Sequence, residues 1–424
     1  MSDQREFDVV LWGATGFAGR LVAEYFAEHY AGEKLQWAVA GRNEQKLRGL
    51  LRDLDREFEG AGEVDYLVGD AFDRGSLGHI AGRTRVVCST VGPYASYGSE
   101  LVSACLANET DYCDLTGEIH WIREMIETHH EEAVGSGTRI VHCCGFDSIP
   151  SDLGTLMVQR RAEQEHGAPC EQVKLFVRGM SGGLSGGTLA SMANAIEAAS
   201  SDSEVRRRML DPYGLNPEGE RTGPDGAPQQ GVRYDDDVGG WTGPFIMAQV
   251  NEKVVRRSNA LLGYEYGRDF RYSECTAFGG DAKGAVSAGG FAAGMTGFAG
   301  AMALKPTRWL LEKLVLPKPG EGPSRKAIEQ GYFEIELIGE GREPHGESFR
   351  VRCRVSADSD PGYGATAIML GESAVCLAKN ELEEGKAGGI LTPATAMGTR
   401  LVERLDEAGV EFSVESNEVS GESS

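Results

Sequence analysis

The sequence has no block of Lys and Arg residues to offset its formal net charge of −23. Because such a chain is repelled by nucleic-acid phosphates, we expect no nucleic-acid partner. The nine Cys residues form no CxxC pair and no Cys/His cluster with the spacing of metal ligands. The first residues, MSDQREF, lack the basic and apolar parts of a secretion signal. We therefore expect a reduced, cytoplasmic protein without a bound metal.

The first third of the chain alternates short β-branched runs with amphipathic segments of helical length. This alternation is typical of an α/β domain with a doubly wound parallel sheet, which we expect over residues 1–150. The predicted helices cover residues 17–30, 43–57, 73–81, 96–108 and 118–134. A chain of 424 residues also exceeds the usual size of one domain, so we expect a second domain.

The remaining residues predict an α+β domain over 151–360 with a mixed or antiparallel sheet. Its predicted elements are a helix at 151–164 and strands near 172–179, 268–276, 331–341 and 348–356. Residues 211–243 are rich in Pro, Gly and Asp, which predicts a long, lid-like loop. Helices at 364–379 and 392–408, within a segment 361–416, are expected to pack back toward the first domain. Residues 417–424 are expected to form a disordered tail.

A glycine-rich segment, GATGFAG, separates the first predicted strand from the first predicted helix. In a dinucleotide-binding turn of this kind, glycines permit the tight turn and the close approach of the pyrophosphate to main-chain N–H groups at the helix N-terminus. The context therefore predicts a Rossmann domain, although the spacing is GxxGxxG and differs from the usual GxGxxG. The residues expected to hold the cofactor here are Gly13, Ala14, Thr15, Gly16, Phe17, Ala18 and Gly19.

The ends of the next strands indicate which dinucleotide is bound. No acid follows the second predicted strand, whereas Arg42, Asn43 and Lys46 there suit a 2′-phosphate, so NADP(H) is preferred over NAD(H). Asp70, at the end of the third strand, is placed either to touch the adenine or to cap the next helix. Residues following the fourth strand are expected to pass beneath the nicotinamide ribose, namely Thr90, Val91 and Gly92.

The chain resembles the saccharopine dehydrogenase-like oxidoreductases, and more closely their trans-acting enoyl reductase branch. The resemblance rests on GATGFAG, AGRN, STVGPYASYG, DYCDLTGE, GFDSIPSDLG, LPKPGEGPS, DPGYGATAIMLGESA and GGILTPATAMG, which span nearly the whole chain. It implies an NADP-binding Rossmann domain, a substrate cleft between domains, and reduction of a C=C bond in a hydrophobic acyl or polyketide-derived lipid precursor. At the segment after the sixth strand, saccharopine reductases have a DPG-like sequence, whereas this chain has FDSIPSD. This difference argues against an amino-acid substrate.

Hydride transfer to an activated alkene requires stabilisation of enolate character and a proton for carbon. Tyr94 and Tyr97 follow the fourth strand and are candidate donors, with core packing as the alternative. Asp114 could orient substrate or the nicotinamide amide, or instead cap a helix. Asp147 and Ser148 lie just beyond the sixth strand and complete the list of catalytic candidates. Two other functions stay open. One is a saccharopine-type C–N oxidoreductase. The other is a cofactor-binding protein without turnover, in which side chains are expected to fill the pocket.

Residues 284–304 carry no charge and are rich in Gly and Ala. One interpretation is a buried or cleft-lining segment. The other is peripheral membrane or lipid contact through residues 284–316. The sequence also leaves open whether the protein is a homodimer.

Overall fold

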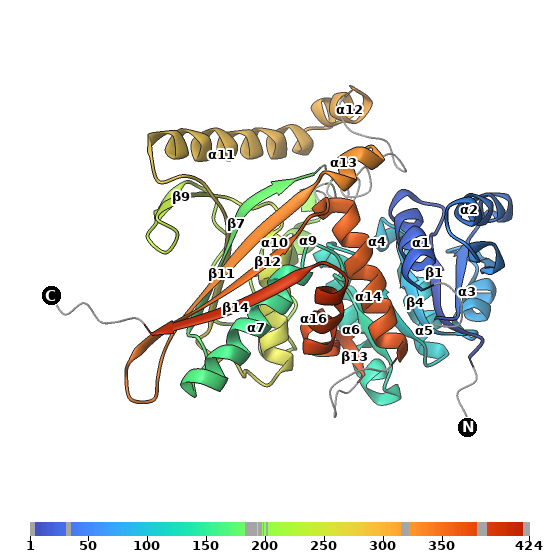
Figure 1. Cartoon of the computed structure of the whole chain (residues 1–424), viewed down its shortest axis with the longest axis horizontal. Helices are drawn as coiled ribbons and strands as arrows, with labels where there is room; N and C mark the ends of the chain where they lie inside the picture. The colour runs from blue at the N-terminus through green and yellow to red at the C-terminus, as the bar shows by residue number, and fades with distance from the viewer. Residues whose placement is uncertain are drawn as a thin grey trace.

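The computed structural model describes residues 5–30, 35–182, 202–314, 322–379 and 388–418, together with Ala193, Glu197, Ala199 and Ser200. These residues build two seven-stranded sheets, one near each end of the molecule in Figure 1. The expected fold class, a doubly wound domain joined to a mixed-sheet domain, is confirmed.

The first sheet has the strand order of a Rossmann domain, 3-2-1-4-5-6, with one further strand beside β6. Every strand pair in it is parallel. Across the sheet, the strands are β13 (Gly389–Leu391), β6 (Arg139–Val141), β5 (Asp111–Asp114), β4 (Thr84–Ser89), β1 (Phe7–Trp12), β2 (Trp37–Gly41) and β3 (Asp65–Val68).

Both faces of this sheet are covered, because alternate residues of its strands enter two different cores. Val9 and Leu11 of β1 belong to one core, and Val10 and Trp12 belong to the other. The helices connecting the strands are α1 (Phe17–His29), α2 (Glu44–Glu57), η2 (Ala61–Glu63), α3 (Arg74–Ala81), α4 (Tyr94–Tyr97), α5 (Ser99–Ala107) and α6 (Ile119–Ser136). The single helix predicted over 96–108 is therefore replaced by α4 and α5.

The second sheet is mixed, since only β7 and β10 pair in parallel. Its strands, in order, are β14 (Glu411–Glu418), β12 (Ser348–Ala357), β11 (Tyr332–Arg342), β7 (Gln172–Ser181), β10 (Arg271–Ala277), β9 (Gly240–Gly243) and β8 (Arg233–Asp235). Helices in this half are α7 (Ile149–His166), α9 (Ser203–Leu210), α10 (Ala248–Leu261), α11 (Ala282–Ala303), α12 (Lys305–Leu314) and α13 (Arg325–Glu329).

The C-terminal segment contributes to both sheets, which the sequence analysis does not anticipate. It contains η3 (Pro361–Ala365), α14 (Thr366–Lys379), α15 (Pro393–Ala396) and α16 (Thr399–Glu407). Helix α14 packs on α1 and the first sheet, as predicted. The helix predicted at 392–408 is broken at Gly398, whose φ is +57°. The prediction of a disordered tail from residue 417 is wrong for its first two residues, which belong to β14; residues 419–424 lie outside the described part.

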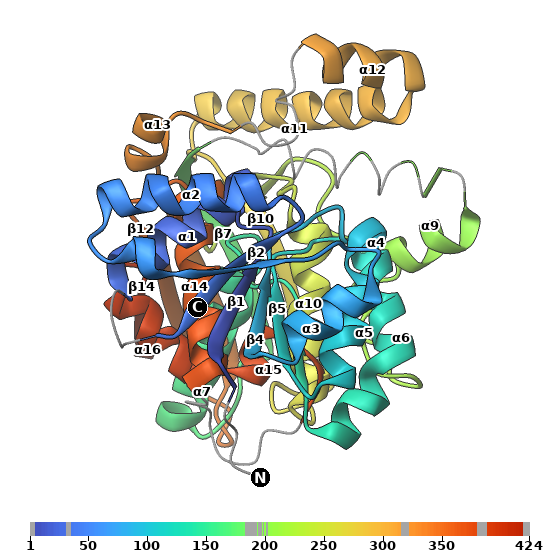
Figure 2. The ribbon, with the colours of Figure 1, turned by 90° about the vertical axis from the view of Figure 1, so that its right-hand side faces the viewer.

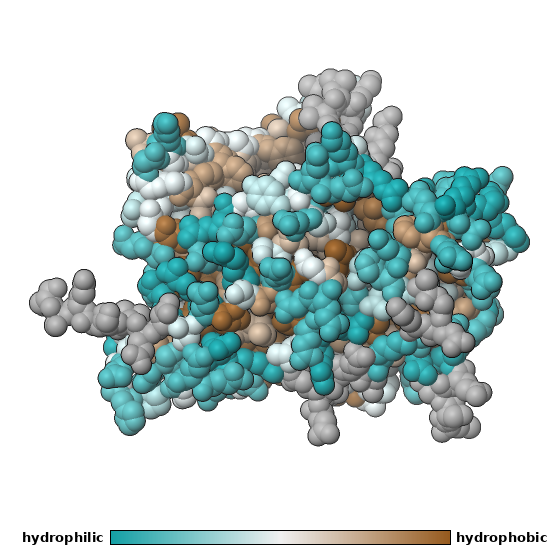
Figure 3. Space-filling view, viewed as in Figure 1, coloured by the Kyte–Doolittle hydropathy of each residue, from teal (hydrophilic) through white to brown (hydrophobic). Residues whose placement is uncertain are grey.

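Helix α11 lies along one edge of the molecule with α12 beside it, away from the first sheet (Figures 1 and 2). Met295, Thr296 and Ala299 on its inner side line a cavity, which supports the cleft-lining interpretation of this segment. Val286 of this helix is exposed, and Figure 3 shows pale to brown residues along the helix. Within the described residues, no helix meets the length and hydropathy required of a membrane span. Lipid contact through 284–316, of which 315 and 316 lie outside the described residues, stays a prediction.

Candidate active site

A cavity of about 1040 Å³ opens at the carboxyl ends of β1–β4. It is bordered on one side by the glycine-rich loop and the strand ends of the first sheet. On the other side it is bordered by residues of the second half, including Pro228–Gln230 of the predicted lid-like loop. The crevice at the carboxyl ends of strands is where open α/β sheets bind ligands.

The glycine-rich loop has the shape of a phosphate cradle. Gly13 has a φ of +92°, and a Cβ there would lie 2.5 Å from the Val91 side chain. A Cβ on Gly19 would lie 2.3 Å from the Gly13 carbonyl oxygen, so these two glycines allow the close packing of the turn. Around Gly16, only that carbonyl oxygen comes within 4 Å of the Cβ position.

Gly16 is also the N-cap of α1 and has no side chain to occupy the first-turn N–H groups. With Gly13, Thr15, Phe17 and Ala18 it lines the cavity, so the helix N-terminus faces open space that fits a pyrophosphate. Ala14 is fully buried, and neither Ala14 nor Gly19 is among the described lining residues. These two residues shape the loop from behind.

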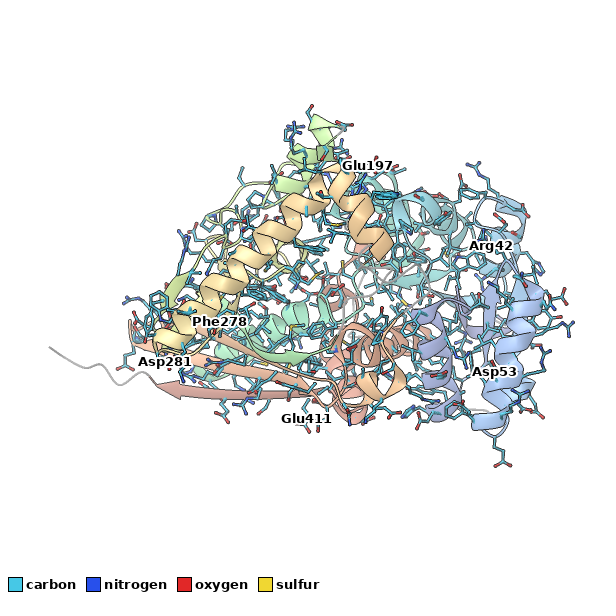
Figure 4. All side chains as sticks on the ribbon, turned by 90° about the horizontal axis from the view of Figure 1, so that it is seen from above. Arg42, Asp53, Glu197, Phe278, Asp281 and Glu411 are labelled. Atoms are coloured by element: carbon cyan, nitrogen blue, oxygen red, sulfur yellow. The ribbon has the colours of Figure 1, made fainter. Side chains whose placement is uncertain are left out.

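Arg42 lines the main cavity and an adjoining hollow of about 510 Å³ at the end of β2. Figure 4 shows it on the first-domain side of the molecule. It forms no ion pair within the described residues. Arg48, which is not among the residues predicted from the sequence, lines the same hollow. It pairs with Glu44, and its guanidinium carbon lies 4.7 Å from the centroid of the Tyr66 ring. These guanidinium groups fit a 2′-phosphate.

Two other residues predicted at the end of β2 lie differently. The Asn43 side chain accepts the Lys46 N–H at 2.9 Å and so caps α2. It reaches only the smaller hollow, and Lys46 is in neither described lining. At the end of β3, Asp70 lines the cavity while its carboxylate accepts the Phe72 N–H at 2.9 Å. Asp73, rather than Asp70, caps α3.

After β4, Thr90, Val91 and Gly92 line the cavity, as expected of residues beneath the cofactor. The Thr90 hydroxyl donates to the Trp12 carbonyl at 3.2 Å, which joins this segment to the glycine-rich loop. Glu118, at the start of α6, accepts the N–H groups of Tyr94 at 2.8 Å and Ala95 at 3.0 Å. Its carboxylate therefore fixes the first turn of α4.

The two candidate tyrosines lie in different surroundings. Tyr94 is buried, its hydroxyl donates to the Ser89 carbonyl at 3.1 Å, and its ring stacks on Trp121. Burial and the nearby Asp114 carboxylate raise the pKa of the Tyr94 phenol well above its ordinary value. Tyr94 lines the cavity as well, and this geometry favours its packing role over proton donation. Tyr97 lines the cavity, where its ring contacts Phe72.

Asp114 and Ser148 are not among the described residues that line the cavity. Asp114 is fully buried and holds His142 at 2.8 Å, the Tyr112 hydroxyl at 3.0 Å and the Thr116 N–H at 3.0 Å. It therefore positions the loop of Thr116, which does line the cavity. Ser148 is buried and donates to Asn251 at 2.9 Å. Both predictions of direct contact with substrate are corrected to structural roles.

Asp147 is the catalytic candidate that the geometry favours. Its carboxyl group is half-buried in the cavity wall and forms no hydrogen bond or ion pair within the described residues. Desolvation by burial raises the pKa of Asp147 to about 6. The group can therefore hold a proton near neutral pH and release it into the cavity.

The part of the cavity beyond Asp147 is mainly apolar. Among the described residues lining the cavity, Arg42 alone is cationic, and it belongs to the hollow at β2. The polar side chains that the second half contributes to the lining are uncharged amides and hydroxyls: Gln229, Gln230, Gln249, Thr296 and Tyr363. The apolar residues are Met209, Leu210, Pro228, Pro244, Phe245, Ile246, Met247, Val250, Met295 and Ala299.

Comparison with known proteins identifies the chain. Residues 9–141 match the family model for the saccharopine dehydrogenase NADP-binding domain. A protein of Mycobacterium tuberculosis (strain ATCC 25618 / H37Rv) named as a trans-acting enoyl reductase is 42% identical over 416 residues, covering 96% of this chain and 97% of the relative. The trans-acting enoyl reductase of Mycobacterium ulcerans (strain Agy99) is 38% identical over 420 residues, with 96% and 98% covered. The chain belongs to the trans-acting enoyl reductase family.

A solved structure agrees with the fold of this trans-acting enoyl reductase family member. Apo saccharopine dehydrogenase (L-Glu forming) from Saccharomyces cerevisiae matches with a TM-score of 0.53 and 12% identity, covering 96% of this chain and 99% of the yeast chain. At this identity the likeness concerns the fold alone. The family model and the enoyl reductase relatives show that the chain is an NADP-dependent oxidoreductase.

Arg42 is expected to determine the preference for NADPH over NADH. Replacing Arg42 with Ala is expected to weaken NADPH binding by about 1–3 kcal/mol through loss of a charge-assisted contact, and to affect NADH much less. Calorimetric titration of both cofactors measures the difference. Lys46→Ala is the matched control, because this nearby cation in the first turn of α2 lies outside both described linings. Equal losses for the two cofactors in Arg42→Ala would refute the assignment.

Proposed function

We propose that the protein uses NADPH to reduce the C=C bond of an uncharged α,β-unsaturated acyl ester or thioester with a hydrophobic, acyl or polyketide-derived chain. The observation that carries this proposal is one continuous cavity. Its wall contains a phosphate-cradling loop, many apolar residues and a protonatable carboxyl group, Asp147, which has no hydrogen-bond or ionic partner within the described residues. The family membership supports the same reaction.

The residues of the chain divide the work of this reaction. The glycine-rich loop would hold the pyrophosphate and Arg42 the 2′-phosphate of the cofactor, which supplies a hydride when bound. Asp147, with its raised pKa, holds a proton and donates it to the α-carbon, where the reduction leaves carbanion character. The apolar residues beyond it would bind the acyl chain and exclude water.

The two alternatives receive less support. A saccharopine-type substrate carries several carboxylates, yet the described lining offers no cation outside the β2 hollow and presents the acids Glu118 and Asp147. Burying a substrate carboxylate beside carboxyl groups of the protein, with no cation near it in the described lining, is unfavourable. A binding protein without turnover is expected to have its pocket filled by side chains, whereas the cavity measures about 1040 Å³.

We also place the enzyme in the cytoplasm. All nine Cys residues are buried and none forms a disulfide, which accords with a reducing compartment.

The decisive experiment follows NADPH oxidation by absorbance with three substrates of equal chain length. A medium-chain trans-2-enoyl thioester of N-acetylcysteamine is expected to be reduced, with the saturated thioester as product. The corresponding free enoic acid is expected to react at least about tenfold more slowly, because its carboxylate meets Asp147 and Glu118 without a cationic partner. Reaction of lysine with an oxo acid and NADPH, without reduction of the thioester, would establish the C–N chemistry and overturn the proposal.

A further inference from the structure

We propose that Phe72 and Tyr97 form an aromatic binding site for the adenine ring of the cofactor. The proposal rests on NADP(H) binding and does not depend on which substrate is reduced. It assigns to Tyr97 a role in cofactor binding instead of the proton donation predicted from its position after β4.

The strand order fixes which end of the cofactor lies near these residues. The pyrophosphate cradle is at β1, Arg42 is at the end of β2, and β3 is the next strand outward. A dinucleotide that places its pyrophosphate at β1 and its 2′-phosphate at β2 extends its adenosine along the β2–β3 edge. Phe72 lies in the loop that follows β3, at this adenosine end.

Phe72 and Tyr97 come from different segments but face the same part of the cavity. Tyr97 is the last residue of α4, and its ring centroid lies 5.6 Å from that of Phe72, with the ring planes inclined at 59°. Both residues line the cavity together with Asp70 and Arg42. With this inclination, one ring can stack on the face of a base while the other contacts its edge.

The exposure of Phe72 also points to a ligand. Its side chain is 70% exposed, although a phenylalanine gains free energy by burial. The surrounding turn holds it there, because Asp70 accepts the Phe72 N–H and the Asp70 N–H donates to the Ser76 hydroxyl at 3.1 Å. A flat adenine ring would cover this surface. Aromatic side chains commonly hold a nucleic-acid base by stacking on its face.

The test uses calorimetry on the full-length protein with two cofactor fragments. Adenosine 2′,5′-bisphosphate contains the adenine, and reduced nicotinamide mononucleotide lacks it. Phe72→Ala and Tyr97→Ala are each expected to raise the Kd of the adenosine fragment roughly five- to hundredfold, the range for one lost stacking contact. The Kd of the nicotinamide fragment is expected to stay within about twofold, since its subsite lies past the pyrophosphate.

Two further variants separate stacking from other roles. Tyr97→Phe retains the ring, so it is expected to keep the wild-type Kd of the adenosine fragment. Tyr332→Ala removes a half-exposed aromatic ring at the start of β11, outside the described lining, and is the matched control for surface and folding effects. A Tyr97→Phe variant with normal cofactor affinity but lost turnover would overturn the proposal. So would alanine variants that bind the adenosine fragment as the wild type does.

Discussion

Replacing Asp147 with Asn is expected to lower kcat by about 100-fold or more while leaving the Kd of NADPH unchanged. The Asn side chain keeps the shape of the carboxyl group but has no acidic proton to donate. In the wild type, burial in the cavity wall raises the pKa of Asp147 to about 6, so about a tenth of the enzyme still carries the proton at pH 7 and about half does at pH 6. The measurement is steady-state turnover of the enoyl thioester, with cofactor affinity measured separately by calorimetry.

The role of Asp147 as a proton donor also predicts how turnover changes with pH. A general acid must be protonated to act, so wild-type kcat is expected to be high below the pKa of Asp147 and to fall as the pH rises through about 6. The residual activity of Asp147→Asn is expected to lack this decrease. Asp53→Asn, which changes an exposed acid on α2 that lies outside the cavity lining, serves as control (Figure 4). Full turnover of Asp147→Asn with an unchanged pH profile would exclude Asp147 as the donor.

Replacing Glu372 with Ala is expected to lower the free energy of unfolding by about 3–5 kcal/mol. This buried carboxylate on α14 accepts hydrogen bonds from the Tyr25 hydroxyl at 2.5 Å and the Tyr30 hydroxyl at 2.6 Å, both from the α1 region. It also pairs with Arg404 of α16 at 2.8 Å. Removing the acceptor leaves a guanidinium and two phenols in a largely buried site, and so loosens the attachment of the C-terminal helices to the first domain.

The surroundings of Glu372 keep its phenol partners neutral. Burial and the adjacent carboxylate raise the pKa of both Tyr25 and Tyr30, so both hydroxyls remain donors at ordinary pH. Urea unfolding monitored by circular dichroism measures the stability. Tyr25→Phe removes one donor and is expected to cost only about 1–2 kcal/mol. If Glu372→Ala costs less than Tyr25→Phe, the network does not bind the helices to the first domain as described.

Much of the first domain could be predicted from sequence because its signals are local. Strands of β-branched residues and helices of period 3.6 alternate there, and the glycine-rich loop needs only adjacent residues to form its turn. The main cofactor contacts expected at the strand ends accordingly line the cavity. Spacing along the chain does not reveal where the two tyrosine side chains lie. The Tyr97 ring contacts Phe72, which follows β3, and the Tyr94 hydroxyl donates to Ser89 of β4.

The elements missed in the second half have non-local causes. Helix α10 buries charged residues, which a hydrophobic pattern does not anticipate. Arg256 is accommodated because it pairs with Asp225 at 2.8 Å and Glu252 at 3.0 Å, and Arg257 donates to the Leu215 and Ile390 carbonyls. Strand β14 reads as polar, yet it pairs with β12 along its whole length. Both depend on partners distant in sequence.

Strand β13 has a consequence for the synthesis of the protein. The first strand of the first sheet begins at Phe7, but its last strand in the chain, β13, ends only at Leu391. Helix α14, which covers part of one face of this sheet, precedes β13 and is therefore also synthesised late. On the ribosome, the nucleotide-binding half therefore emerges with a bare edge at β6 and an uncovered apolar face. Its folding is completed only after almost the entire polypeptide has been translated, so a protein truncated before β13 would lack a finished cofactor domain.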